Sequence, residues 1–263
     1  TRDTLALADR AGPDDLVLAL VSGGASANWI APAAGISLAE KQAVTRSLLG
    51  WGVVAGAFYL VVGIVLGLTR DGFDLARHPL SLLMLGDGGW MQRANLVISA
   101  IMVAAAALGF ARALDGIGPA RLAGGALLLH AVCLLGSAVF PPDPMAGFPA
   151  GADAARASTS GVLHLAFGAT GFVAMAVAAF AVGRWYAEGS ASGRAGYSRL
   201  SGGLILAGFA GGAVLATQVA GILLLWVAVV AGWAWLSATS ADLYRRTPHP
   251  DRERRPSPGG LES

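Results

Sequence analysis

Charged residues are scarce in this sequence: Asp, Glu, Lys and Arg make up only 13% of its 263 residues. A typical globular domain carries about a quarter charged residues. Hydrophobic residues make up 55% instead, and they gather in long runs. Low charge combined with long apolar runs predicts an integral membrane protein, whose main partner is the lipid bilayer.

Cysteine is nearly absent as well, since Cys133 is the single cysteine of the chain. One thiol excludes an intrachain disulfide framework and any cysteine-rich zinc site. The net charge is only +2, and the basic residues lie between the apolar runs and at the C-terminus. This pattern is typical of the flanks of membrane spans, and no nucleic-acid partner is expected.

Six apolar segments follow from Leu48 onward, at about 48–68, 94–114, 122–140, 162–183, 200–219 and 221–240. Each is close to the roughly 20 residues that a helix needs to cross the hydrocarbon core. The last two form one run that is too long for a single span, which predicts a tight turn near residues 218–221. We therefore expect an all-α integral membrane protein: a six-transmembrane-helix bundle over residues 48–241, followed by a disordered basic tail at 242–263.

Basic residues in the connections between the segments predict the orientation. The side of the two termini holds Lys41, Arg46, Arg112, Arg121, Arg184, Arg194, Arg199, Arg245 and Arg246. The other side holds only Arg70, Arg77, Arg93 and Arg156. The sequence thus predicts a multi-pass protein of the bacterial cytoplasmic (inner) membrane with both termini in the cytoplasm.

The first 47 residues are typical of a soluble α/β protein instead. An apolar run at residues 15–21 predicts a buried strand, and the glycine-rich turn 22–26 closes it. Ser37 and Glu40, three residues apart, predict the capping box of a following helix. A fragment of one strand and its helices lacks the further strands that it would need, so we expect a cytoplasmic extension rather than an independent domain.

The stretch "AGPDDLVLALVSGGASANWIAPAAGISLAEKQAVTRSLL" resembles the bacterial glycerate 2-kinase family. The resemblance implies that Ser22, Gly23, Gly24 and Ser26 are the remnant of a glycine-rich phosphate or substrate loop. The lysine-bearing and acidic catalytic segments of that family have no counterpart after Leu49. Phosphoryl transfer needs metal ligands and charge stabilisers from several segments, so kinase activity is not expected of this truncated piece.

Residues from about 45 to 240 resemble a second family, the bacterial membrane proteins of domain-of-unknown-function family 998. The blocks that carry the resemblance are "GLTRDGFDLARHPLSLLMLGDGGWMQRANLVISA", "GSAVFPPDPMAGFPAG" and "SGVLHLAFGATGF". The resemblance implies a multi-span helical membrane protein and supplies no established reaction. A fusion joined near residues 44–50 explains both resemblances.

Polar residues on the predicted extracytoplasmic side form the first candidate site. Asp71, Asp74 and His78 follow the first span, Asp143 follows the third, and His164 opens the fourth. Histidines with several carboxylates are able to bind a divalent metal or to act as acid and base. Pairing of the aspartates with the nearby arginines is the structural alternative. The spacing matches no metal motif, and no metal or cofactor is assigned.

Three polar residues inside the spans form the second group of candidates. His130 lies near the middle of the third span, and Cys133 shares its helix face. We expect a neutral His130 hydrogen-bonded to a neighbouring helix. Asn95, together with Gln92, is expected to bond between helices at the start of the second span.

The sequence leaves the biochemical role open. One hypothesis is binding of a small molecule, lipid or metal at the extracytoplasmic face, and the alternative is a membrane-embedded enzyme acting at that face. A fragment of a glycerate 2-kinase is a second alternative. Small residues four apart favour close helix packing or a homo-oligomer, namely Gly52/Gly56, Gly63/Gly67 and Gly208/Gly212.

Overall fold

A computed structural model of the chain describes residues 37–114, 117–152 and 157–249. Most of this part is helical: α3 (Leu38–Thr69), α4 (Gly89–Ala113), α5 (Ile117–Val139), α6 (Thr159–Glu188), α7 (Ser192–Val214) and α8 (Val219–Arg246). A short 3-10 helix, η1 (Leu80–Met84), lies between α3 and α4. The described residues contain no strand, which confirms the all-α class. The predicted strand, the loop Ser22–Ser26 and most of the C-terminal tail lie outside the described residues.

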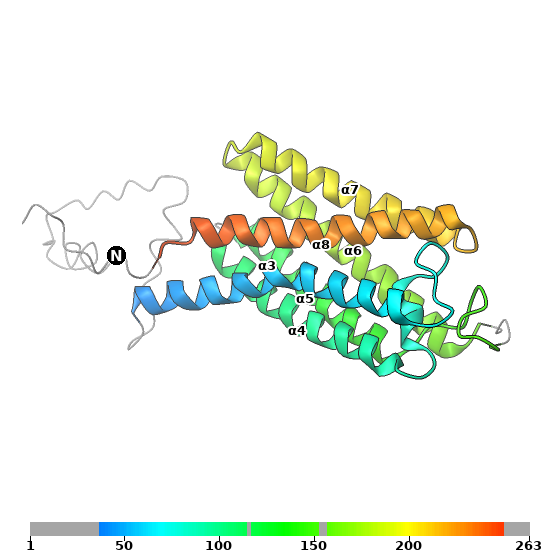
Figure 1. Ribbon diagram of the computed structural model, residues 1–263. Coiled ribbons are helices and arrows are strands. Elements are labelled where there is room, and N and C mark those ends of the chain that lie inside the picture. The colour runs from blue at the N-terminus through cyan, green and yellow to red at the C-terminus, as the bar shows by residue number, and fades with distance from the viewer. Residues whose placement is uncertain (1–36, 115–116, 153–156, 250–263) are drawn as a thin grey trace, which may run out of the picture.

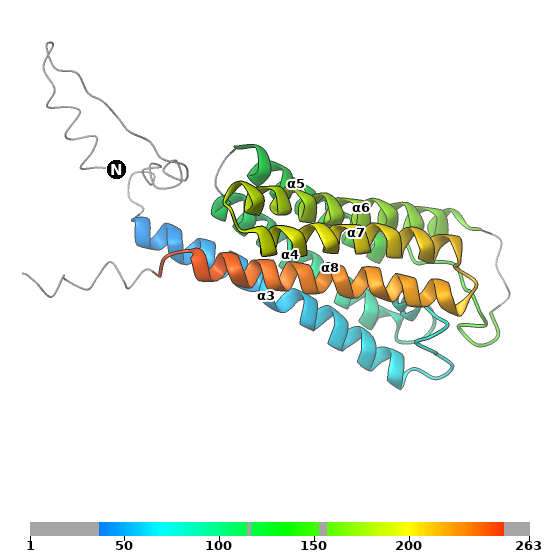
Figure 2. The ribbon, with the colours of Figure 1, turned by 90° about the horizontal axis from the view of Figure 1, so that it is seen from above.

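The six helices alternate in direction and close into a ring (Figure 1). Each helix packs against the next one in the chain, and α8 packs against α3. Residues 70–88, 140–158 and 215–218 connect the helices at one end, which we call the loop end. The beginning of α3 and the end of α8 lie together at the opposite, terminal end (Figure 2).

Five of the six helices are long and apolar enough to cross a membrane: α3, α4, α5, α6 and α8. The sequence predicted six spans, and five of the described helices meet the length and composition expected of a span. Helix α7 has the length, about 34 Å at 1.5 Å per residue, but it is rich in glycine and serine and carries Arg194 and Arg199. The turn between α7 and α8 lies at residues 215–218, slightly earlier than predicted.

Large apolar side chains cover the outside of the bundle. Val61, Ile101 and Leu200 are each at least 60% exposed, whereas Phe110 and Trp235 are fully buried inside. An apolar exterior of this extent is unfavourable in water and is matched by lipid chains. The chain is therefore a multi-pass membrane protein.

Helix α3 joins the soluble-like opening of the sequence to the first span. Its capping box is present as predicted: the Ser37 hydroxyl accepts from the Glu40 backbone N–H at 3.2 Å, and the Glu40 carboxylate accepts from the Ser37 N–H at 2.7 Å. From there one helix of 32 residues runs to Thr69. Near its beginning, Arg46 donates to the backbone oxygens of Tyr244 and Thr247 at the end of α8.

Two of the three predicted glycine pairs lie where long helices of this chain approach each other, whereas Gly63 and Gly67 face side chains of the connection after α3. A Cβ atom on Gly56 of α3 would be 2.8 Å from the Trp233 backbone oxygen of α8. A Cβ atom on Gly208 of α7 would be 2.6 Å from the Leu224 backbone oxygen of α8. These glycine faces are therefore filled by the chain's own helices, so a second copy would have to use another surface.

Candidate functional site

The predicted extracytoplasmic residues all lie at or near the loop end, but they do not surround one site. Asp71 and Asp74 are exposed in the connection after α3, whereas His78 in the same connection is buried. Asp143 lies in the connection before α6, and His164 lies in the second turn of α6. Of these five residues only His164 lines the cavity inside the described bundle that is characterised below.

His78 links the two long connections of the loop end. Its Nδ1 accepts the Asp74 backbone N–H at 2.9 Å, so the ring proton is on Nε2, which donates to the Ala146 backbone oxygen at 3.2 Å. The rings of Phe73 and Phe148 pack on it at centroid distances of 5.2 and 5.5 Å. With both nitrogens used in this way, His78 holds the two connections together.

Asp143 is bound to the beginning of α6. Its carboxylate accepts from the Ser158 backbone N–H at 3.0 Å and from the Ser158 hydroxyl at 2.5 Å. The Ser158 hydroxyl in turn caps α6 by accepting the Gly161 N–H. These two hydrogen bonds from Ser158 hold the pKa of the Asp143 carboxyl below its usual range.

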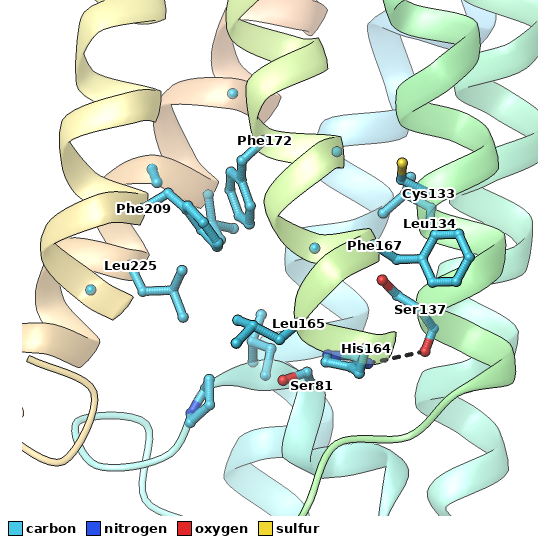
Figure 3. A pocket seen from close by; sticks show the side chains of 18 of the residues that line it. Ser81, Cys133, Leu134, Ser137, His164, Leu165, Phe167, Phe172, Phe209 and Leu225 are labelled. Carbon is cyan, nitrogen blue, oxygen red and sulfur yellow. Dashed lines mark hydrogen bonds between the residues drawn. The ribbon is translucent and has the colours of Figure 1, made fainter. Parts of the chain in front are cut away.

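His164 bonds to the last turn of α5. Its Nδ1 donates to the backbone oxygens of Phe140, at 2.8 Å, and Ser137, at 3.3 Å. The final carbonyls of a helix have no partner within the helix, so this ring satisfies groups that would otherwise be left unpaired. The rest of the ring faces the cavity beside Ser137 (Figure 3).

The cavity lies inside the helix ring, toward the loop end, and has a volume of about 280 Å³. Figure 3 shows Leu165 of α6 and Leu225 of α8 on opposite sides of it, while Phe172 of α6 and Phe209 of α7 stack on each other. Most of its other walls are also apolar. A concave apolar site with few polar groups is the usual form of a small-molecule site.

Two buried polar atoms in the cavity wall have no hydrogen-bond partner in the described part of the chain: His130 Nε2 and Gln92 Nε2. His130 Nδ1 donates to the Gly171 backbone oxygen at 2.8 Å, which leaves Nε2 as an acceptor. The Gln92 side-chain oxygen accepts from Asn95 at 3.2 Å, which leaves its amide nitrogen as a donor. Both side chains are more than nine-tenths buried, and the two nitrogens themselves are almost inaccessible, so one acceptor and one donor lie in the wall just behind the cavity surface, away from water.

The two histidines of the cavity wall lie at different depths. His164 is level with Ser137, and His130 is level with Gly171. Seven residues separate these levels along both α5 and α6, which corresponds to about 10 Å. The two rings therefore cannot bind one metal ion together. In the described residues no three His, Cys, Asp or Glu side chains are placed to hold a metal.

Residues 53–242 match the sequence family described as "Protein of unknown function (DUF998)". This stretch is most of the chain. The chain belongs to the DUF998 family. The helices and the cavity described above thus fall within the DUF998 region, except for the first turns of α3 and the last turn of α8.

Residues 1–57 of this DUF998 protein match a second family, "Domain of unknown function (DUF4147)", which is similar to the N-terminal part of glycerate kinases. A protein of Agrobacterium vitis, provisionally named a hydroxypyruvate reductase, is 39% identical over 74 residues. That match covers 28% of this chain and 19% of the relative. No solved structure matches the chain.

The intramembrane residues singled out from the sequence lie at the cavity of the DUF998 region or beside it. His130 bonds to a neighbouring helix as expected, and Cys133 lines the cavity one turn away. Asn95 donates to the Tyr59 backbone oxygen of α3, an interhelical bond of 3.2 Å. Gln92 was also expected to bond between helices, but its oxygen accepts from Asn95 of its own helix and its amide nitrogen has no partner in the described residues. The cavity itself was missed, since a polar residue in an apolar run is the only signal that the sequence carries for it.

Proposed function

We propose that this protein binds a mostly apolar molecule carrying a polar group in the cavity of its helix ring. The observation that carries the proposal is the pair of unpartnered buried atoms, His130 Nε2 and Gln92 Nε2. A buried polar group without a partner costs about 1–3 kcal/mol. A ligand hydroxyl that donates to the imidazole nitrogen or accepts from the amide recovers part of this cost.

The apolar walls of the cavity contribute little to the preference of a ligand for the cavity over the surrounding lipid. Lipid chains are as apolar as leucine side chains, so moving an apolar group from lipid into the cavity gains little from the hydrophobic effect. The hydrogen bonds to His130 and Gln92 are worth more there, because water does not compete for them. Recognition therefore depends on the polar group of the ligand.

We further propose that all six helices cross the cytoplasmic membrane, with the loop end outside. Helix α7 packs along both α6 and α8, and its Ser198 and Ser201 are buried. Of the twelve described Lys and Arg residues, nine lie toward the terminal end and three toward the loop end. Basic residues are retained on the cytoplasmic side, which puts both termini there.

Neither kinase nor reductase activity is proposed for the chain. Its match to the Agrobacterium vitis protein spans only 19% of that relative. A catalytic site for phosphoryl transfer is built from several chain segments. A membrane-embedded enzyme would use the same cavity, but in the described part of the chain the hydrogen bonds of its two histidines, His130 and His164, go to backbone carbonyls rather than to a nucleophile.

Native mass spectrometry of the protein purified from its own membranes tests the proposed binding. The wild type should carry a noncovalently bound molecule, seen as a discrete increase in mass. His130→Asn keeps a donor for the Gly171 carbonyl but has no acceptor at the position of Nε2, because its side chain is too short, and Gln92→Met removes the donor. Each should bind about 5- to 150-fold more weakly, as expected for about 1–3 kcal/mol.

Ser240→Ala is the matched control, because Ser240 Oγ is also buried without a partner but lies outside the cavity wall. The Ser240→Ala protein should carry as much of the bound molecule as the wild type. A wild type that carries no bound molecule, or an H130N protein that carries as much as the wild type, would overturn the proposal.

A further inference from the structure

The cavity reaches the outer surface of the bundle between α6 and α7. Leu165 and Gly168 of α6 and Ala213 of α7 line the cavity and are themselves exposed or half-buried, with Leu165 59% exposed. Figure 3 shows Leu165 on the side of α6 that faces α7 and α8. We call this opening, lined by Leu165, Gly168 and Ala213, the portal.

A pair of aromatic rings closes the deep side of the portal. Phe172 lies one turn below Gly168 on α6, and Phe209 lies one turn below Ala213 on α7. The two rings stack at a centroid distance of 4.7 Å, so they join the helices at this level. Toward the loop end no such contact bridges the portal residues, and a Cβ atom on Gly168 would meet no atom within 4 Å.

The surface around the portal is apolar. Val162 of α6 and Val214 of α7, which flank it, are 56% and 82% exposed. Leu165 lies six residues into α6, about 9 Å from its first residue. At this level of a spanning helix the portal faces lipid chains, so a molecule that passes through it comes from the bilayer.

We propose that the ligand is a single-chain lipid with a hydroxyl head group, which enters sideways through the portal. The inference rests on the binding proposed above and adds the class of ligand and its route. The head group lies inside, donating to His130 Nε2 or accepting from Gln92, while the chain leaves through the portal into the bilayer. A volume of about 280 Å³ is at the lower end for small-molecule sites, which excludes a two-chain phospholipid from the interior.

Photolabelling of the protein in phospholipid vesicles tests this inference. The probe is a long-chain primary alcohol with a diazirine in its chain, and the labelled residues are mapped by mass spectrometry. We expect labels on α6 and α7 at the portal, displaced by excess unlabelled alcohol. Gly168→Phe should lower this labelling about tenfold, because it fills the portal without a clash.

Gly203→Phe is the matched control: Gly203 lies on α7 outside the cavity, and a Cβ atom there also meets nothing within 4 Å. It should label like the wild type. If the Gly168→Phe protein is labelled normally while the H130N protein is not labelled, the proposed entry route is wrong and the proposed binding site is supported. If the wild type shows no displaceable label, the lipid class proposed here is wrong, whereas the binding proposal is overturned only by the absence of a bound molecule in native mass spectrometry. Equal labelling by a diazirine phospholipid would overturn the single-chain class.

Discussion

His78 uses both ring nitrogens on backbone groups of two connections that lie 68 residues apart in the chain. Neighbouring residues do not share this role, since Arg77 is exposed and bonds only through its backbone N–H to Asp74. The residue that the sequence suggested as an acid or metal ligand thus acts in the structure as a link between the connections.

Replacing His78 by Phe should destabilise the bundle. The ring shape is kept, but the Asp74 N–H and the Ala146 carbonyl lose their partner, at a cost of about 1–3 kcal/mol. Thermal unfolding in detergent measures the change, and Arg77→Ala should shift the midpoint far less. An H78F protein that melts with the wild type would show that water replaces the ring at no cost.

The interaction of Asp143 with Ser158 should make stability depend on pH. Because the folded-state pKa of Asp143 is lowered, its contribution is fully present above the ordinary value of about 3.9 and is lost as the pH falls through the folded value. The difference in melting temperature between the wild type and Asp143→Asn should therefore shrink from pH 7 to pH 3. An unchanged difference over this range would contradict the assignment.

Helices α3 and α8 approach so closely at Gly56 that there is no room for a side chain. Gly56→Ala should destabilise the protein by about 1–3 kcal/mol, because overpacking must move the α8 backbone near Trp233. Gly50→Ala on the same helix meets no atom within 4 Å and should leave the melting temperature unchanged or higher. Equal melting of the two variants would mean that α3 shifts without cost.

Hydropathy predicted the helices better than their ends. The capping box at Ser37 marked the beginning of α3, because its two residues bond locally. The turn at residues 215–218 was placed too late, since Leu215 and Ala216 are as apolar as the helices beside them. The length of α3 was also missed. Its charged beginning and its apolar remainder have the same helical backbone and differ only in the environment that they suit.

The cavity was not predictable from any one stretch of sequence. His130 and Asn95 stood out as polar residues in apolar runs, and both do bond between helices. The cavity wall, however, draws residues from all six helices and from the three connections of the loop end. Such a site forms only when the six helices have packed into the ring, so no local sequence pattern predicts it.

The opposite ends of the bundle allow its proposed orientation to be tested. In a Cys133→Ser background, Gly147→Cys lies at the loop end and Ser190→Cys at the terminal end. A membrane-impermeant maleimide added to intact cells should label the first and not the second, and inverted vesicles should reverse the result. Labelling of Ser190→Cys in intact cells would show that the orientation is the opposite of the one proposed.

Helix α3 contains the place where the two family matches meet, residues 53–57. A gene join inside a helix has to respect the reading frame of the codons and also the rotation of the helix, about 100° per residue. One residue added between Arg46 and Leu49 would keep the frame and yet turn Arg46 away from the end of α8. Few joining points satisfy both conditions, so homologues that carry both segments should vary in sequence here but not in length.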